Sequence, residues 1–256
     1  MLVRSEGVRI VRLFHEGDVR YGLADESTVT LISDEPFAAW ETEAVIPLPH
    51  AQLLSPCVPT KVVCAGINYR GHAKEMGHAL PDEPVIFLKP PTAVIGHGAE
   101  VHIPQGFTTV DYEGELAVVI GRRTRNVTPE EALEHVLGYT CGNDITNRVL
   151  QKKDGQWTRA KSFDTFCPLG PWIETDVDPG ELTLQTFVNG ELRQSGETSD
   201  MIFSVPELVS FVSSVMTLLP GDVVMTGTPA GIGPVVSGDT VEVRIDGIGS
   251  LISHIV

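Results

Sequence analysis

The sequence of 256 residues has few basic side chains and lacks any long apolar run, and both shortages exclude functions. Eighteen lysines and arginines stand against thirty-four acidic residues, so the formal charge of −16 repels nucleic acids and anionic membrane surfaces. The longest apolar runs, such as residues 116–120, are far shorter than the ~20 residues of a membrane-spanning helix. We therefore expect neither a nucleic-acid nor a membrane partner. An anionic small molecule can still bind where a cation and a few basic side chains reverse the field locally.

Several sequence signatures are also missing. The four cysteines show no C-x-x-C spacing, and the N-terminal segment MLVRSEGVRI has no apolar stretch of signal-peptide length, so we expect a cytoplasmic location. No G-x-S-x-G elbow is present, and the cysteines lack an adjacent histidine, which argues against covalent catalysis. The Gly-rich segment TGTPAGIGP lacks the Lys-Ser/Thr of a P-loop, so phosphate binding is not expected there.

What is present is a succession of short β-like pieces with few helices. VRIVRLFH, VRYGLA and TVTLI predict a small antiparallel meander within residues 1–33. A stretch with several prolines and no periodicity follows up to Pro59, and we place a domain boundary in it near residue 58. Residues 1–58 then form a small N-terminal β-rich domain and residues 59–256 a catalytic domain. Because strands and helices do not alternate regularly, we expect a mainly β fold of the α+β class.

Helices are expected at three places in the larger domain. NYRGHAKEMG indicates a turn that leads into a short helix, and Thr128 with Pro129 marks the start of a helix over PEEALEHVLGYT. SVPELVSFVSSVMTL predicts another helix. Strands are indicated by KVVCAGI, EPVIFLKP, AEVHIP, GELAVVIG, PWIET, GDVVMTG, GDTVEVRI and SLISHIV.

Acidic residues recur at alternate positions in DYEGELAVVIG. Asp111, Glu113 and Glu115 share one face of the expected strand, and that face continues with apolar residues. Like charges so close together need a cation or a proton, and oxygen ligands without nearby Cys or a His pair suit Mg²⁺, Mn²⁺ or Ca²⁺. An exposed start of a strand is the alternative. Asp144, in GYTCGNDITNR, fits an ordinary turn equally well.

Four other polar residues qualify for roles in catalysis or binding. His72 and Glu75 have the H-x-x-E spacing that places both on one side of a helix, where a carboxylate orients an imidazole as a base for water. A surface helical pair is the alternative. Lys161 and Arg148 stand near aromatic or apolar runs and can supply local positive charge, although Lys161 equally fits a surface lysine with an apolar stem.

Taken in order, seven segments of the chain resemble the fumarylacetoacetate hydrolase family. They are NYRGHAKEMG, EPVIFLKPPTAVIG, EGELAVVIG, GYTCGNDITNR, AKSFDTFCPLGPW, VNGELRQ and PGDVVMTGTPAGIGP, within a match from Lys61 to the C-terminus. The resemblance implies a mixed β-sandwich roll as the catalytic domain, and it implies a homodimer. It also implies Mg²⁺ or Mn²⁺ held by Glu113, Glu115 and Asp144.

The same resemblance implies roles for individual residues. His72 and Glu75 become a catalytic dyad on a mobile segment, with water as the nucleophile, and Lys161 contacts substrate oxygens and stabilises enolate charge. Substrate contacts are implied for Arg148, Gln151 and Thr228. The chain departs from the family pattern Asn-Asp-x-Thr-Ala-Arg-Asp, because Asn147 and Val149 replace the small residue and the second acid. We expect these two replacements to reshape the pocket wall.

The activity implied is that of a metal-dependent C–C bond hydrolase or lyase. A metal that chelates the carboxylate and 2-oxo oxygens of a small 2-oxo or 2,4-dioxo acid stabilises a pyruvate enolate, so the C3–C4 bond can break by hydrolysis or decarboxylation. The alternative is a 2-hydroxyhepta-2,4-diene-1,7-dioate isomerase of aromatic catabolism. A non-enzymatic alternative is a relative that only binds a small carboxylate. For residues 1–58 we expect a structural role that helps to close the site.

Overall fold

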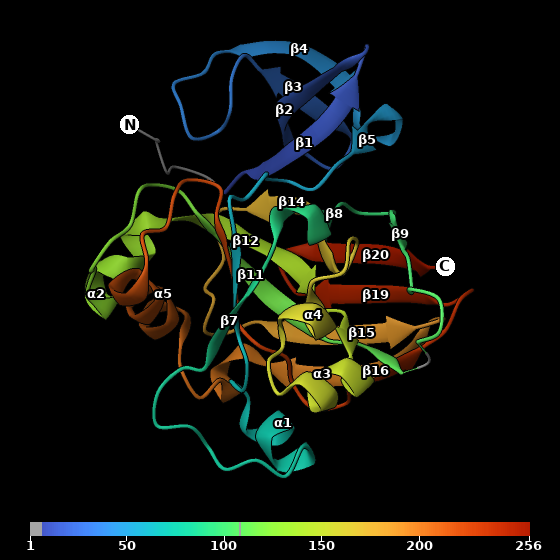
Figure 1. Ribbon diagram of the computed structural model, residues 1–256. Helices are drawn as coiled ribbons and strands as arrows, with labels where there is room; N and C mark the ends of the chain where they lie inside the picture. Colours follow the sequence, from blue (N-terminus) through green and yellow to red (C-terminus); the bar gives the residue numbers. More distant parts are fainter. Residues whose placement is uncertain (1–6, 108) are drawn as a thin grey trace.

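The computed structural model describes residues 7–107 and 109–256, and its strands gather in two lobes (Figure 1). The smaller, N-terminal lobe is an antiparallel meander whose inner side chains Val11, Leu13, Val29 and Leu31 pack as a small core. Its elements are β1 (Arg9–His15), β2 (Asp18–Ala24), β3 (Thr28–Ile32), β4 (Thr42–Pro47), η1 (Leu48–His50) and β5 (Gln52–Leu53). The predicted meander is therefore confirmed, although its first six residues lie outside the described ones.

Two strands, β4 and β5, lie in the Pro-containing stretch, where the sequence predicts no regular structure. The alternation signal is absent from β4 because nearly all of its residues are exposed, so apolar and polar positions do not separate into two faces. β4 pairs with β3, and β5 pairs with β1. Each strand also packs one partly buried side chain on the small core, Ile46 from β4 and Leu53 from β5, which is too few for a pattern in the sequence.

One sheet runs through both lobes, in the order β4-β3-β2-β1-β14-β12-β11-β17-β6-β7. The lobes join where β1 pairs with β14, at Arg9↔Glu174 and Ile10↔Ile173. The strands of this sheet in the larger lobe are β6 (Val62–Ala65), β7 (Ile86–Lys89), β11 (Gly114–Ile120), β12 (Val136–Asn143), β14 (Cys167–Glu174) and β17 (Val223–Met225), with the short β8 (Val94–Ile95) beside β14. β11 and β12 are buried along their whole length, so residues that they carry lie in the interior.

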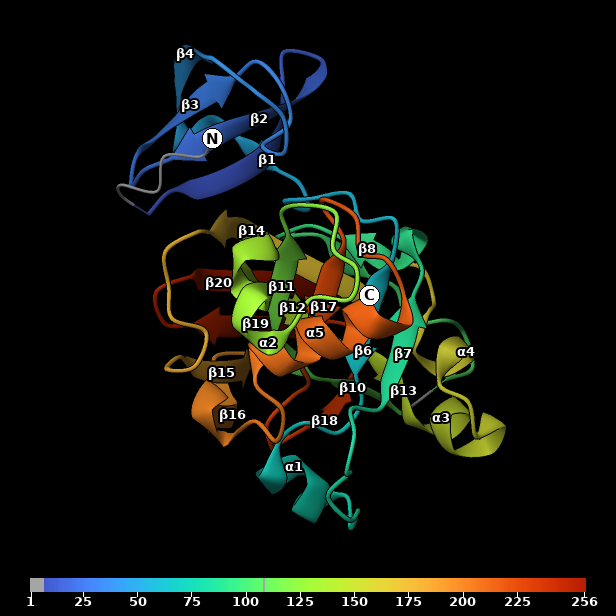
Figure 2. The same ribbon diagram turned by 90° about the vertical axis from the view of Figure 1, so that its left-hand side faces the viewer.

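Alternate residues of β11 point into two different cores, as the period of two in a strand requires. Leu116 and Val118 pack with α5 and with a second sheet, whereas Ala117 and Val119 pack on the opposite face. Figure 2 shows α2 and α5 over β11, β12 and β17. The covering elements are α2 (Pro129–Ala132), η3 (Leu133–His135), α5 (Val205–Val215), and the second sheet of β16 (Glu191–Glu197), β15 (Thr183–Val188), β19 (Thr240–Ile245), β20 (Gly249–Ile255) and β9 (Glu100–Val101).

The segment DYEGELAVVIG forms two strands, where the sequence predicts one. Asp111 belongs to a small three-stranded sheet, and the ladder is interrupted at Glu113, whose backbone N–H donates to the side chain of Asn143 (3.0 Å). The small sheet consists of β13 (Thr146–Asn147), β10 (Val110–Tyr112) and β18 (Gly233–Val235). The remaining elements are α1 (Arg70–Glu75), η2 (Pro91–Ala93), α3 (Arg148–Asp154), α4 (Thr158–Lys161) and η4 (Thr198–Asp200).

The helix predicted over PEEALEHVLGYT is too long. It starts as expected, with a capping box of Thr128 and Glu131, but α2 ends at Ala132, and VLGYT belongs to β12. β12 lies between β11 and β14, and a Cβ at Gly138 would come within 2.3 Å of Glu174 O, so close strand pairing overrides the helical pattern.

The helix predicted over SVPELVSFVSSVMTL is confirmed as α5, which starts with a capping box of Ser204 and Glu207. The mainly β fold with few helices is confirmed as well. In the part of the chain that the structure describes, no helix is both long enough and apolar enough to cross a bilayer.

Candidate active site

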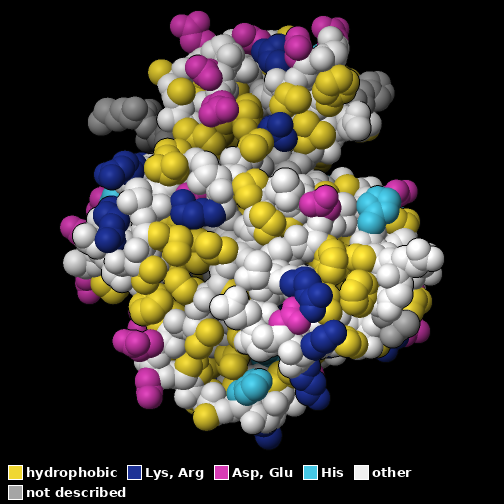
Figure 3. All heavy atoms as spheres, viewed as in Figure 1, with side chains coloured by type: hydrophobic (Ala, Val, Ile, Leu, Met, Phe, Trp, Pro, Cys, Tyr) yellow, Lys and Arg dark blue, Asp and Glu magenta, His cyan; other side chains and the backbone are white. Residues whose placement is uncertain are grey.

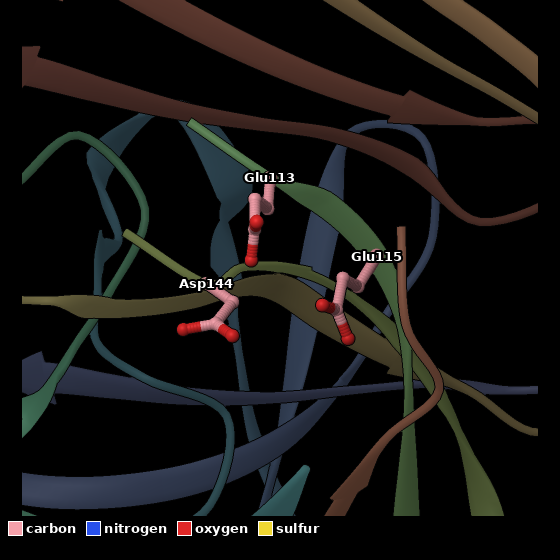
Figure 4. Close-up of side chains that lie close together, drawn as sticks. All are labelled: Glu113, Glu115 and Asp144. Atoms are coloured by element: carbon pink, nitrogen blue, oxygen red, sulfur yellow. The ribbon is translucent and has the colours of Figure 1, made fainter. Parts of the chain in front are cut away.

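Three carboxylates meet in the interior of the larger lobe. Glu113, Glu115 and Asp144 are buried, and one oxygen from each lies within 4.8 Å of the others (Figure 4). Glu113 precedes β11, Glu115 is its second residue, and Asp144 directly follows β12. The register Gly114↔Asn143 brings these segments together, and Asp144 N–H donates to Glu113 O (2.9 Å). Strand pairing therefore explains why acids distant in sequence converge.

Lys161 supplies a positive charge inside this cluster. Its Nζ donates to Glu113 Oε2 (2.7 Å), Asp144 Oδ2 (2.5 Å) and Thr146 Oγ1 (2.7 Å), and lies 4.9 Å from the centre of the Phe87 ring. Its side chain is only 3% exposed, so the alternative of a surface lysine is wrong. Burial acts against the charged form, but the Asp144 and Glu113 carboxylates outweigh it and raise the pKa of Lys161.

A second buried lysine, Lys89 at the end of β7, is absent from the sequence-based set of candidates. Its Nζ donates to Asp144 Oδ1, to Phe166 O (2.5 Å) and to Ile145 O (3.3 Å), and its side chain is fully buried. One signal was available in the sequence, because Lys89 shares a strand face with Phe87, two residues earlier in IFLK. Lys89 and Lys161 together bind both carboxylate oxygens of Asp144.

Arg148, the first residue of α3, holds three partners at once. Its Nε donates to Asp111 Oδ2 (2.7 Å), its Nη1 to Gln151 Oε1 (2.9 Å), and its Nη2 to Glu113 Oε1. The structure therefore brings Arg148 to the carboxylate cluster, and Gln151 to Arg148. Asp111 does not face the cluster centre but anchors the arginine from the neighbouring small sheet.

The two departures from the family pattern flank this arginine and have separate consequences. Asn147 caps α3, since its side chain accepts a hydrogen bond from Leu150 N–H (3.0 Å). Val149 is 51% exposed and lies at the surface. The larger side chain at 147 thus fixes the start of the helix that carries Arg148, whereas Val149 changes the outer surface.

The two glutamates of the cluster differ in electrostatic environment. Burial raises the pKa of Glu113, but Lys161 and Arg148 outweigh burial and hold that pKa below its ordinary value. Burial and the Asp144 and Glu113 carboxylates raise the pKa of Glu115 well above its ordinary value. Negative charge at Glu115 is therefore incompletely balanced by these neighbours. Because all three donors are carboxylate oxygens, the residues present fit a hard divalent cation, which would complete the balance.

His72 and Glu75 form the predicted pair on α1. His72 is buried, and its Nδ1 lies 3.1 Å from Glu75 Oε2. The other oxygen of Glu75 accepts a hydrogen bond from Gly231 N–H (3.0 Å). A carboxylate partner favours the proton on Nδ1, which leaves Nε2 as the basic nitrogen.

Thr228 lies beside the backbone of the cluster. Its hydroxyl donates to Gly114 O (2.8 Å) and accepts from Gln194 Nε2 (2.7 Å). One residue earlier, Gly227 N–H donates to Glu115 Oε2 (2.7 Å). The Gly-rich turn after β17 therefore binds both the side chain of one glutamate and the peptide between the two.

The helices that carry Arg148 and Lys161 also bear basic residues on their outer surface. Figure 3 shows Lys and Arg side chains gathered over α3 and α4 on this face. The exposed basic residues of the two helices are Lys152, Lys153 and Arg159. Arg159 is paired with Asp154 (2.7 and 2.5 Å), so Lys152 and Lys153 carry the positive charge of this surface.

Two family models match the chain. The fumarylacetoacetate (FAA) hydrolase C-terminal model matches residues 61–256, and the Rv2993c-like N-terminal model matches residues 8–56. Protein Rv2993c of Mycobacterium tuberculosis is 48% identical over 243 residues, which are 93% of this chain and 92% of that protein. The match therefore extends through both lobes.

Relatives with named activities are similar over most of their length. Oxaloacetate tautomerase YisK of Bacillus subtilis is 46% identical over 219 residues, 80% of this chain and 72% of that protein. The crystal structure of 2-hydroxyhepta-2,4-diene-1,7-dioate isomerase from Mycobacterium marinum matches with a TM-score of 0.91 at 45% identity, covering 97% of this chain and 98% of the other. The resemblance carried by the seven motifs is thus confirmed, and the chain belongs to the fumarylacetoacetate hydrolase family.

Proposed function

We propose that this protein is a divalent-metal-dependent enzyme that cleaves the C3–C4 bond of a small 2-oxo or 2,4-dioxo carboxylic acid. The observation that carries the proposal is the buried cluster of Glu113, Glu115 and Asp144 with Lys161 held against it. This cluster combines oxygen ligands and a fixed positive charge at one point of an acidic chain. A 2-oxo acid needs both, because its carboxylate is an anion and its enolate carries a further negative charge.

Mg²⁺ or Mn²⁺ is the proposed cofactor, with Glu113, Glu115 and Asp144 as its ligands. When bound, such an ion supplies Lewis-acid stabilisation for negative charge on the 2-oxo oxygen. Neighbouring groups orient two of these ligands. Gly227 N–H donates to Glu115 Oε2, and Lys89 Nζ donates to Asp144 Oδ1.

Lys161 and Arg148 are the proposed electrostatic partners of the substrate. Carboxylate neighbours raise the pKa of each against the effect of burial, so both stay positively charged. Lys161 stabilises the charge that develops on substrate oxygens beside the cluster. Arg148 is held in place by Asp111 and Gln151, and we propose that Gln151 and Thr228 complete the contacts to the substrate.

His72 is the proposed general base, oriented by Glu75. For an acylpyruvate, His72 takes a proton from water, and the oxygen of that water forms a bond to the C4 carbonyl carbon. The C3–C4 bond then breaks, its electron pair stays on the pyruvate fragment as an enolate, and the proton held by His72 is returned to C3. For oxaloacetate, the C4 carboxylate leaves as carbon dioxide and the same enolate forms without attack by water.

Proton transfer without bond cleavage is the second candidate, and the names of relatives favour it. YisK is named an oxaloacetate tautomerase, and the M. marinum protein an isomerase of a hydroxydienedioate. In such a reaction the base removes a proton and returns it at another atom of the conjugated chain, so the carbon skeleton stays intact. The His72–Glu75 pair favours cleavage, because hydrolysis requires activated water. The non-enzymatic alternative, binding of a carboxylate alone, needs no such pair.

The test is one panel of substrates under matched metal conditions. Acylpyruvates, fumarylpyruvate, oxaloacetate and 2-hydroxyhepta-2,4-diene-1,7-dioate are incubated with Mg²⁺, Mn²⁺ or EDTA, and the products are followed by proton NMR. Metal-dependent release of pyruvate supports cleavage. Interconversion of enol and keto forms, or migration of a double bond, without pyruvate supports the second candidate. No turnover of any member of the panel contradicts both.

Other expectations from the sequence stay predictions. These are the homodimer, the cytoplasmic location and the domain boundary near residue 58. We propose a structural role for residues 1–58, because their lobe joins the other through β1 and β14 and supplies none of the site residues described above. Light scattering coupled to size-exclusion chromatography measures the mass of the particle in solution and tests the dimer.

A further inference from the structure

The peptide between the two glutamate ligands lies where strand pairing stops. On one side, β12 holds the backbone of Glu113, through Asn143 Oδ1 and through Asp144 N–H. On the other side of β11, β17 pairs only with Ala117 to Val119, and the chain leaves the sheet after Met225. The N–H and C=O of Gly114 therefore have no strand partner on the β17 side, and buried backbone groups need one.

Two side chains take the place of the missing strand. Gly114 N–H donates to Gln194 Oε1 (3.0 Å), and Gly114 O accepts from Thr228 Oγ1 (2.8 Å). Gln194 Nε2 in turn donates to Thr228 Oγ1 (2.7 Å) and to Pro229 O (2.8 Å), which closes a ring of hydrogen bonds. Gln194 is completely buried, so water does not replace these bonds.

Gln194 belongs to a different sheet from the ligands, and the turn that carries Thr228 lies directly on its strand. A Cβ at Gly231 would lie 2.3 Å from Arg193 O, and one at Gly196 would lie 2.6 Å from Pro229 Cβ. A Cβ at Gly114 would itself lie 2.2 Å from Thr186 Oγ1. β16, the turn and the peptide between the ligands are thus packed in contact.

We propose that Gln194 is a positioning residue for the carboxylate cluster. It touches neither the proposed ion nor the substrate. It holds the N–H of Gly114, the residue that separates Glu113 from Glu115, and it orients the Thr228 hydroxyl toward the C=O of the same residue. This inference rests on the proposed function of the three acids as metal ligands. Residues that support ligands in this way typically change metal affinity by about 10–100-fold when they are replaced.

The test is Mn²⁺ affinity of the full-length protein without substrate, measured from the electron paramagnetic resonance signal of free Mn²⁺. Gln194→Met keeps the length of the side chain and removes the hydrogen bonds to Gly114 N–H, Thr228 and Pro229, so affinity should fall by about 10-fold or more. The matched control is Thr186→Val, because Thr186 is the register partner of Gln194 on β15. Its hydroxyl has no hydrogen-bond partner among the described residues, so this variant should bind Mn²⁺ like the wild type.

Thr228→Val provides a second variant if Gln194→Met does not fold at the temperature of the titration. It breaks the same ring from the turn, and Thr228→Ser, which keeps the hydroxyl, should restore affinity. The loss in the Gln194→Met, Thr228→Val double variant should be smaller than the sum of the single losses, because the ring breaks only once.

The outcomes separate this inference from the proposed function. Wild-type affinity in folded Gln194→Met, or in Thr228→Val, overturns the positioning role while the metal site stands. Equal Mn²⁺ binding by the wild type and Glu113→Gln overturns the metal site, and the positioning role falls with it. Equal weakening by Thr186→Val also overturns the positioning role, because any change in the core would then act alike.

Discussion

The two lobes treat charged side chains in opposite ways. In the N-terminal lobe, Arg20 pairs with Glu43 while 31% and 42% of the two side chains stay exposed. In the larger lobe, Lys89 pairs with Asp144, and at most 1% of either side chain is exposed. Taking a charge out of water costs several kcal/mol, and a partner offsets this cost only with good geometry. The exposed Arg20–Glu43 pair avoids that cost. The larger lobe accepts it at Asp222, which pairs with Lys61, and above all at the carboxylate cluster, where two lysines and three acids are buried together and where we expect the chemistry.

Removing a buried carboxylate should have the largest effect. Glu113→Ala and Asp144→Ala should each lower metal-dependent turnover by more than ~100-fold, since replacing even an outer partner of a metal costs about 10–100-fold. Calorimetric titration with Mn²⁺ and a circular dichroism spectrum check binding and fold. Glu43→Ala removes an exposed carboxylate from the N-terminal lobe and should leave turnover unchanged. Unaltered Mn²⁺ binding in both site variants would falsify the ligand assignment.

Loss of the base should affect one step and spare binding. His72→Ala should slow acyl cleavage by about 10²–10⁴-fold, the usual contribution of a general base, and should retain affinity for Mn²⁺ and oxalate. Steady-state rates with an acylpyruvate and calorimetry with oxalate provide the two measurements. His15→Ala, in β1 of the N-terminal lobe, is the control and should behave like the wild type. Normal cleavage by His72→Ala removes His72 from the mechanism.

The contrast between buried and exposed ion pairs can be measured directly as stability. Lys89→Met leaves the buried Asp144 Oδ1 without its donor, so the free energy of unfolding should fall by ~3–5 kcal/mol. Arg20→Met breaks the exposed pair with Glu43 and should cost ~1 kcal/mol or less. Urea unfolding in EDTA compares both variants with the wild type. Similar losses in the two variants would show that burial does not distinguish the lobes.

The smallest effect belongs to a turn of the N-terminal lobe. Hydrogen bonds from Ser27 N–H and from the Thr28 hydroxyl and amide lower the pKa of Asp25 from 3.8 to about 2. Since the folded-state pKa is depressed, this carboxylate contributes its full stability above pH 3.8 and loses it as the pH falls through about 2. Asp25→Asn should therefore lower the melting temperature slightly at pH 7.

Melting curves of Asp25→Asn at a series of pH values check the sign. The difference from the wild type should shrink as the pH falls from 3.8 through about 2, because Asp25 gains a proton over this range and loses its charge. Turnover at neutral pH should not change, since the turn lies in the lobe without site residues. A difference that grows as the pH falls contradicts the depressed pKa of Asp25.

The sequence was most informative where burial follows the period of a strand. The meander could be predicted because Val11 and Leu13, and likewise Val29 and Leu31, point to one core at alternate positions. β4 could not, because all of its residues except Ile46 are exposed. The end of α2 was mispredicted for a different reason, since VLGYT satisfies a helical pattern and only pairing with β11 and β14 makes it a strand.

At the site, the order of the motifs indicated the candidate residues but not the neighbouring groups that hold them in place. Asp144 fits a turn in the sequence, and only the register of β11 with β12 places it beside Glu113. The burial of Lys89 could have been predicted from strand periodicity, because Lys89 follows Phe87 on the same face of the strand. Gln194 was not, because its partners are a peptide group and a turn far away in the chain.

His72 and Glu75 lie on the same short helix, α1, so the imidazole is oriented by a neighbour that moves with it. A rigid movement of α1 away from Gly231 would break the hydrogen bond from Gly231 N–H to Glu75. It would leave the distance between the imidazole and the carboxylate unchanged. In the mechanism that we propose, the orientation of His72 is therefore set before a substrate arrives. Little further rotational entropy of the imidazole then has to be lost on the way to the transition state.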